Sequence, residues 1–177
     1  MARALYCLAL MLLIVILVAA EEDAKITLLK FEKVMEDDVD FESHVEMIKQ
    51  DDGTAIINGE LKQHVSLDND WKVNITLYHA HKPDEEYKKS PERLHTGVCE
   101  FMSTYYKKFF YEKLKNYSNA PHPDTCPLPP EHYHLKDYPY ETPKIKKMMR
   151  NGYYRMFGRL QKEEHVKIEY LVEFLVE

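Results

Sequence analysis

Alternation of apolar and polar residues dominates this chain and predicts mainly β-structure. The two clearest segments are residues 71–80 and residues 165–176, in which nearly every second residue is apolar. This period of two is typical of a strand in a sheet with one buried face. The residues predicted to point inward are Trp71, Val73, Ile75, Leu77, Ile168, Tyr170, Val172 and Phe174.

Weaker patterns predict further strands at residues 25–35, 41–50, 54–67, 132–138 and 152–161. Asp51-Asp52-Gly53 is a tight-turn signal, so residues 54–67 should return antiparallel to the strand before them. Asn58-Gly59 is compatible with either a second hairpin turn or a bulge, and we favour a bulge in one long strand because the two turn signals lie too close together. Residues 81–97 are polar, contain two prolines, and predict a long connection.

An aromatic-rich stretch that begins at Cys99 breaks the alternation and predicts a helix. Its apolar side chains recur at helical spacing, and the face so predicted carries Met102, Tyr105, Tyr106, Phe109, Lys113 and Leu114. The helix should end before Asn119-Ala120-Pro121, since the residue before a proline rarely stays helical. About seven strands with one inserted helix predict an antiparallel two-sheet β-sandwich.

The first twenty residues have the pattern of a secretory signal peptide. Residues 1–20 carry Arg3, an apolar core over residues 5–18, and small residues Val18 and Ala20 before the expected cleavage site. An uncleaved membrane anchor is the alternative, and the apolar run is short for a bilayer span. We therefore expect a secreted, extracellular protein in which residues 21–177 form a single domain.

Cleavage would remove Cys7 and leave two cysteines in an oxidising compartment. Two cysteines permit one intramolecular bond, so we expect a disulfide between Cys99 and Cys126. Asn74-Ile75-Thr76 and Asn116-Tyr117-Ser118 are N-glycosylation acceptors. Alternation places Asn74 on the exposed face of its strand, where a glycan can be carried.

The formal net charge of −6 hides an asymmetry along the chain. Acidic residues concentrate in residues 21–70, whereas residues 144–159 are basic and contain no acid. This basic segment predicts either a surface for an anionic partner or a solvated face attracted to the acidic one, and we favour the latter. Its basic residues are Lys144, Lys146, Lys147, Arg150, Arg155 and Arg159. A nucleic-acid partner is not expected of an acidic, secreted chain.

Candidate catalytic chemistry is weak. The chain has no G-x-S-x-G motif, no phosphate-binding loop and no free cysteine after cleavage. His79-Ala80-His81 and His132-Tyr133-His134 each have a spacing that zinc can use, but such pairs near loops are more often solvated. We therefore expect neither an enzyme, nor a metal site, nor a cofactor.

Several segments together resemble a family of insect secreted domains of unknown function. The segments are FEKV near the start, NGEL followed by D-x-D-W-K-V, then VCEFMSTYYKKF, YSN-x-P, TCPLPPEHYHLKDY and NGYYRMFGRL. That family is allied to the CheB-type chemosensory proteins and to ML lipid-recognition domains such as the ganglioside activator. The resemblance implies a β-sandwich whose sheets part to form an apolar cup, with Cys99 and Cys126 as the matching disulfide.

Two functions from different classes are therefore compatible with the sequence. The first is binding of a lipid or other hydrophobic ligand without chemistry, in chemosensation or lipid transport, by the inward strand residues with Met102 and Phe109 as a cover. The alternative is an extracellular module with a filled core that binds a protein partner or membrane receptor through basic and aromatic side chains.

Overall fold

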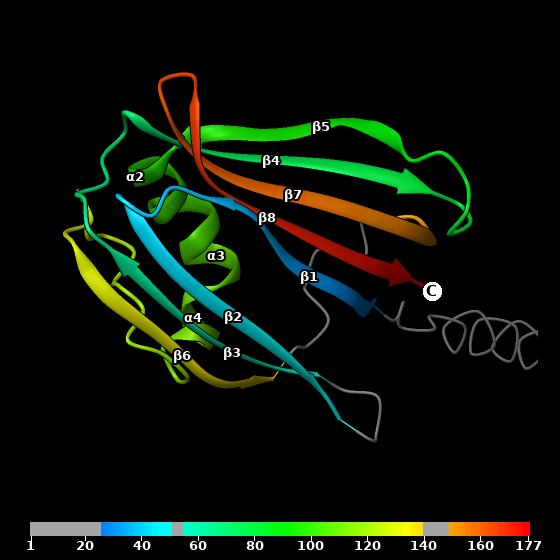
Figure 1. Ribbon diagram of the computed structural model, residues 1–177, viewed down its shortest axis with the longest axis horizontal. Helices are drawn as coiled ribbons and strands as arrows, with labels where there is room; N and C mark the ends of the chain where they lie inside the picture. The colour runs from blue at the N-terminus through cyan, green and yellow to red at the C-terminus, as the bar shows by residue number, and fades with distance from the viewer. Residues whose placement is uncertain (1–25, 51–54, 140–148) are drawn as a thin grey trace, which may run out of the picture.

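The protein is a two-sheet antiparallel β-sandwich, as the alternation predicts (Figure 1). The computed structural model describes residues 26–50, 55–139 and 149–177. The larger sheet has the strand order β1-β8-β7-β4-β5, and the smaller has the order β2-β3-β6. The strands of the larger sheet are β1 (Ile26–Glu36), β4 (Trp71–Ala80), β5 (Lys88–Gly97), β7 (Gly152–Lys162) and β8 (His165–Val176). Those of the smaller are β2 (Phe41–Lys49), β3 (Ala55–Gln63) and β6 (Glu131–Pro139).

Strand β5 corrects the expectation that residues 81–97 form a long connection. It pairs with β4 at the edge of the larger sheet and contains Pro91. Proline cannot donate to a ladder hydrogen bond, and an edge strand tolerates it because one of its sides has no neighbour. Polar composition and a proline are therefore compatible with an edge strand, although they predicted a connection.

In the smaller sheet, β3 continues through Asn58-Gly59 as one strand, so the alternative of a second hairpin turn is absent from this described segment. β2 and β3 pair antiparallel, as predicted, while the turn signal at residues 51–53 lies outside the described residues. The pairing of β3 with β6 has a register shift at this point, where Asp137 adopts a positive φ of 52°. β3 ends at Gln63 rather than at Leu67, and Leu67 forms an isolated bridge with Leu128.

The helical stretch has four short segments rather than one regular helix. They are α2 (Val98–Phe101), η1 (Met102–Tyr106), α3 (Lys107–Phe109) and α4 (Tyr111–Leu114), with η1 in π-helical geometry and an irregular φ of −121° at Phe110. A π-turn holds more residues than an α-turn, so it rotates the side chains of the next turn about the helix axis. Met102 and Tyr106 are buried as predicted, but Tyr105 and Phe109 remain 42% and 37% exposed, so the predicted face is wrong at these two positions.

The helical segments lie between the sheets at one end of the sandwich (Figure 1). Strands β1 and β2 lie close together at the turn that joins them and diverge toward their other ends (Figure 1). No helix within the described ranges is long and apolar enough to cross a membrane. The helical segments thus mark one end of the sandwich, and the candidate site is described relative to that end.

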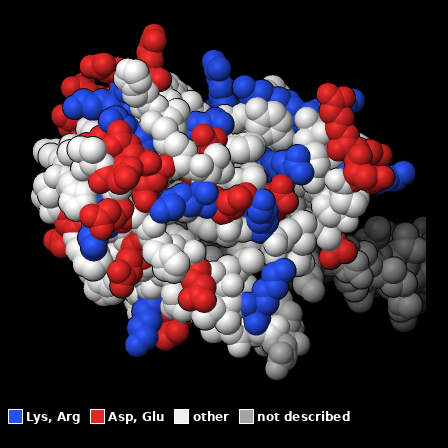
Figure 2. Space-filling model, viewed as in Figure 1, with Lys and Arg blue, Asp and Glu red and all other residues white. Residues whose placement is uncertain are grey.

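Charges of both signs are interspersed over the face shown in Figure 2. Arg155 donates to Glu173 at 2.8 Å, and Arg159 lies 2.7 Å from Glu169, both pairs bridging β7 and β8. Arg150 is exposed, while Lys144, Lys146 and Lys147 lie outside the described residues. The two arginines in β7 therefore pair with glutamates of the neighbouring strand β8. The interpretation favoured from the sequence was instead an attraction between the basic segment and the acidic residues 21–70.

Candidate functional site

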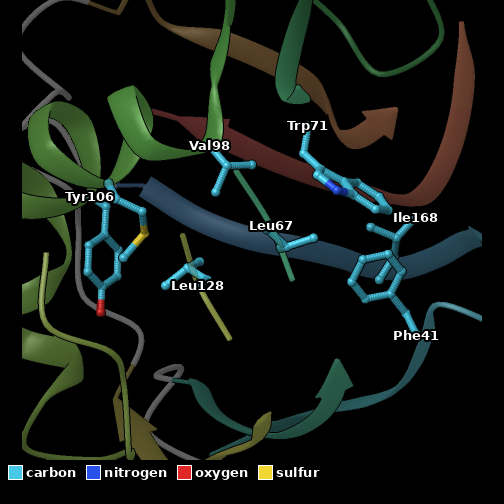
Figure 3. Close-up of a cluster of buried hydrophobic side chains, with 8 residues drawn as sticks. Phe41, Leu67, Trp71, Val98, Tyr106, Leu128 and Ile168 are labelled. Carbon is cyan, nitrogen blue, oxygen red and sulfur yellow. The ribbon is translucent and has the colours of Figure 1, made fainter. Parts of the chain in front are cut away.

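A first apolar cluster fills the end of the sandwich that holds the helical segments. In Figure 3, Phe41 of β2, Trp71 of β4 and Ile168 of β8 converge from the two sheets. The Phe41 and Trp71 rings meet edge to face with centroids 5.7 Å apart, a favourable arrangement for aromatic pairs. The remaining buried members are Leu67, Val98, Met102, Tyr106 and Leu128. This end of the sandwich is an ordinary packed core.

The loop after the helical segments is fastened to this core. The predicted disulfide between Cys99 and Cys126 is confirmed, with Cα atoms 5.5 Å apart. The amide nitrogen and carbonyl oxygen of Leu67 pair with those of Leu128 at 2.9 and 2.8 Å. The side-chain amide of Gln63, only 4% exposed, donates to the carbonyl oxygens of Val65 and Pro129 at 2.8 and 2.9 Å. The loop is thus held from both sides.

A second apolar cluster lies farther along the larger sheet. Its buried members are Ile26, Tyr154, Phe174 and Val176, with Leu77, Met149, Met156 and Val172 packed against them. Met149 lies shortly before β7, and all the other residues belong to β1, β4, β7 or β8. Among the described residues, the smaller sheet contributes none. The two sheets therefore share the first cluster but not the second.

Gly158 lies between the two clusters on the inner face of β7. Two residues away on one side, Leu160 packs against the first cluster, and two residues away on the other, Met156 packs against the second. Because side chains alternate, Gly158 faces the same way, beside its register partners Ile75 and Tyr170. Apart from Gly158 itself and its two chain neighbours, a Cβ atom built on Gly158 would meet no heavy atom of the described residues within 4 Å. Among the described residues, the inner face thus has open space in front of Gly158, between the two apolar clusters.

A chain of polar side chains borders this space and joins the two sheets. Tyr170 of β8 is hydrogen-bonded to Ser43 of β2, and the Ser43 hydroxyl donates to Glu36 of β1. The Lys33 ammonium donates to Glu36 at 2.6 Å and to the Ser43 carbonyl oxygen at 2.7 Å. Two register shifts in β1 set Lys33 opposite Tyr170 and Glu36 opposite Ile168, on the inner side of the strand, where the Glu36 side chain is 12% exposed and that of Lys33 remains 40% exposed. We call these four residues the polar chain.

Burial and hydrogen bonding fix the protonation of this polar chain. Burial raises the pKa of the Tyr170 phenol, and the hydrogen bond with Ser43 offsets only part of this effect. Burial also opposes ionisation of Glu36, but the hydrogen bonds from Lys33 and Ser43 outweigh it and lower the pKa of the carboxyl. At neutral pH the phenol is therefore protonated and the carboxylate is ionised.

The strand residues predicted to line a ligand site all belong to one face of the larger sheet. Trp71 and Ile168 are members of the first cluster, against which Val73 and Tyr170 pack. Phe174 is a member of the second cluster, against which Leu77 and Val172 pack. Ile75 lies between the clusters beside Gly158. The structure thus brings these strand residues together on one surface.

The predicted cover residues separate, and the sequence interpretation missed other parts of the site. Met102 is buried in the first cluster, whereas Phe109 belongs to neither cluster. The sequence patterns do not single out Gly158, Lys33 or Glu36. A glycine inside a strand often marks a close approach by a ligand or another backbone, and this was the available signal for Gly158.

The two glycosylation acceptors differ in their surroundings. Asn74 lies on the outer face of β4, where its side chain is half-buried and its register partners are His95 and Arg159. Thr76, the hydroxyl residue of the same acceptor, is only 5% exposed. Asn116 is exposed in the turn after α4 and donates to the carbonyl oxygen of Glu112 at 3.2 Å.

The two histidine pairs lie in different sheets: His79 is in β4 with His81 directly after it, whereas His132 and His134 are in β6. The rings of His79 and His81 lie 4.9 Å apart, and His79 contacts the carbonyl oxygen of Asn151 at 3.2 Å. His132 lies 3.5 Å from Glu60 on the smaller sheet. Within residues 26–50, 55–139 and 149–177, no three His, Cys, Asp or Glu side chains are grouped as metal ligands.

A protein-family model matches the central part of the chain. A family model described as a protein of unknown function (DUF1091) matches residues 73–156. The matched segment runs from β4 through the helical segments and β6 into β7, and it includes both cysteines of the disulfide. No curated protein matches the chain.

Proposed function

We propose that this protein is a secreted, non-enzymatic carrier that binds a hydrophobic ligand between its two sheets. The observation that carries the proposal is the open space in front of Gly158, flanked by two apolar clusters on the same inner face. Ligand sites are concave, mostly apolar and furnished with a few polar groups. The polar chain, which includes Tyr170, supplies such groups here.

The protonation of the polar chain favours binding over catalysis. A general acid or base works best when its pKa lies near the operating pH. Here the pKa of Tyr170 is raised above its ordinary value near 10, and that of Glu36 is lowered from its ordinary value near 4.5. Both shifts move the groups away from neutrality, so neither is suited to proton transfer at pH 7.

Secretion is supported by three features. Residues 1–20 have the pattern of a signal peptide, the disulfide is typical of an oxidising compartment, and the remaining chain carries two glycosylation acceptors. The resemblance to insect secreted domains favours a role in chemosensation or in lipid transport. A membrane receptor that accepts the ligand is a natural partner in either role.

Native mass spectrometry of the protein secreted from insect cells and deglycosylated tests the proposal directly. We expect a mass excess that disappears on denaturation and matches a lipid or another apolar molecule. A mass equal to that of the chain from Glu21 less two hydrogens would confirm cleavage and the disulfide but would contradict tight carriage.

A series of substitutions at Gly158 tests the location of the ligand. Gly158→Ala should retain binding of diphenylhexatriene, an apolar fluorescent probe, whereas Gly158→Trp should reduce it at least tenfold by filling the space. Leu171→Trp is the matched control, because Leu171 adjoins Tyr170 in β8 but alternates to the outer face. Equal binding by the Gly158→Trp and Leu171→Trp variants would place the probe elsewhere and contradict this site.

A second candidate function, recognition of a protein partner, is favoured by the surface of the helical segments. Tyr105, Phe109 and Phe110 are all large and at least 37% exposed, and the Lys108 ammonium lies 5.1 Å from the centre of the Phe109 ring. Exposed aromatic residues are enriched at interfaces. In that case the double variant Phe109→Ser, Phe110→Ser would abolish receptor binding. The substitutions at Gly158 would not change receptor binding.

A further inference from the structure

We infer that the ligand is a neutral amphiphile whose polar end is a hydroxyl group, and that this hydroxyl donates to the phenol oxygen of Tyr170. The inference rests on the proposed function and adds the chemical class of the ligand. Its basis is the number and direction of the protons in the polar chain, which determine what hydrogen-bonding capacity remains for a ligand.

The proton inventory begins at Glu36. The ionised carboxylate can only accept, and it accepts from Lys33 and from the Ser43 hydroxyl. Ser43 has a single hydroxyl proton, and this proton is committed to Glu36. In the hydrogen bond between Ser43 and Tyr170, the donor must therefore be the phenol.

Tyr170 consequently presents an acceptor and no proton. A phenol oxygen that donates its one proton still has lone-pair capacity to accept a hydrogen bond. Burial keeps this phenol protonated well beyond neutral pH, so the direction of the chain is fixed under physiological conditions. Tyr170 is the register partner of Gly158, which fronts the open space. A ligand lying there meets apolar walls and, at Tyr170, one acceptor to which no other described residue donates.

This arrangement selects among polar ends. A hydroxyl can donate to Tyr170 and complete the polar chain. An ionised carboxylate cannot donate, and it would approach the Glu36 carboxylate, which pairs with one ammonium among the described residues, that of Lys33. An ether or a hydrocarbon also lacks a donor. One net hydrogen bond of about 1 kcal/mol corresponds to a preference of about fivefold for the alcohol.

The test compares 1-dodecanol, methyl dodecyl ether and dodecanoate as competitors of bound diphenylhexatriene on the whole secreted chain. We expect dodecanol to bind about fivefold more tightly than the ether, and dodecanoate to bind no better than the ether. In Tyr170→Phe the advantage of the alcohol should disappear while the affinity for the ether stays unchanged. Tyr78→Phe, on the outer face of β4, is the control and should behave as wild type.

Ser43→Ala makes the inference falsifiable even if Tyr170→Phe folds poorly. Without Ser43, the phenol proton is released and can be donated to a ligand oxygen, so the ether should gain affinity relative to the alcohol. Equal affinities for alcohol and ether in the wild type, or equal weakening of both by Tyr170→Phe, would show that the polar chain is only structural. Failure of diphenylhexatriene to bind at all would instead refute the carrier itself.

Discussion

Gln63 provides the sharpest stability prediction, because one side chain holds the loop around Leu128 against the first cluster. Its buried amide donates to three carbonyl oxygens, those of Val65, Leu128 and Pro129, at 2.8, 3.3 and 2.9 Å. The Leu128 carbonyl also accepts from the Leu67 amide, so it keeps a partner when Gln63 is replaced. Two carbonyl groups, those of Val65 and Pro129, lose this donor.

Replacement by leucine should lower the free energy of unfolding by about 2–4 kcal/mol, since each buried polar group deprived of its partner costs about 1–3 kcal/mol. Replacement by glutamate keeps the shape of the side chain but directs a carboxylate at carbonyl oxygens. An uncompensated buried charge should cost more, about 3–5 kcal/mol at pH 7.5.

The two variants should also differ in their dependence on pH. Burial without a cation raises the folded-state pKa of the introduced carboxyl above its unfolded value of about 4.3. Protonation then favours the folded state, so the deficit of Gln63→Glu is full above the raised pKa and shrinks as pH falls toward 5. The Gln63→Leu variant introduces no titrating group, and its deficit should not change in this way.

Guanidinium unfolding followed by fluorescence of the single tryptophan measures both effects, because Trp71 lies in the cluster that this loop covers. Lys62→Leu serves as control, since the exposed pair of Lys62 with Glu42 should contribute no more than about 1 kcal/mol. A Gln63→Leu variant within about 0.5 kcal/mol of wild type would refute the assignment of Gln63 as an anchor. A Gln63→Glu deficit that is the same at pH 7.5 and pH 5 would refute the electrostatic part.

Three further predictions concern the disulfide, the polar chain and the helical segments. Replacing Cys99 and Cys126 together by alanine should cost about 3.5 kcal/mol of stability through loop entropy, measured by denaturant unfolding with and without reductant; an unchanged midpoint would contradict it. Glu36→Gln should be less stable than wild type at pH 7, and this difference should vanish as pH falls below about 4.5 and through the lowered pKa of Glu36; a difference that persists at pH 2 would contradict it. Met102→Ala should cost about 2–5 kcal/mol in thermal unfolding, whereas Phe109→Ala on the exposed side should cost about 1 kcal/mol or less; equal losses would mean that the helix face is misassigned.

The sequence predicts the parts of this fold that depend on simple periodicity. Strands β4 and β8 alternate inward apolar residues with outward residues that are mostly polar, and their pattern is clear for that reason. Strand β5 escapes the pattern because an edge strand with a proline need not be apolar. The disulfide is predictable because residues 21–177, which exclude the predicted signal peptide, contain two cysteines and so permit one pairing.

The site is less predictable because it depends on irregular geometry. Two register shifts in β1 turn Lys33 and Glu36 inward, and period-two counting fails across such bulges. The π-turn in η1 rotates Tyr105 and Phe109 outward, which a constant helical period cannot anticipate. The space before Gly158 depends on the distance between two sheets, and no local pattern of residues encodes that distance.

The burial of Thr76 bears on when a sugar could be attached to Asn74. A glycosyltransferase must reach both the asparagine amide and the threonine hydroxyl of its acceptor, and in the folded protein the hydroxyl residue is 5% exposed. Thr76 pairs with Arg93 of β5 and with Phe157 of β7, and β7 is synthesised much later than β4. We therefore expect any glycan on Asn74 to be added before β4 pairs with its neighbours, whereas the exposed Asn116 can be modified in the folded protein. The fraction of molecules glycosylated at Asn74 would then report how quickly the larger sheet assembles during synthesis.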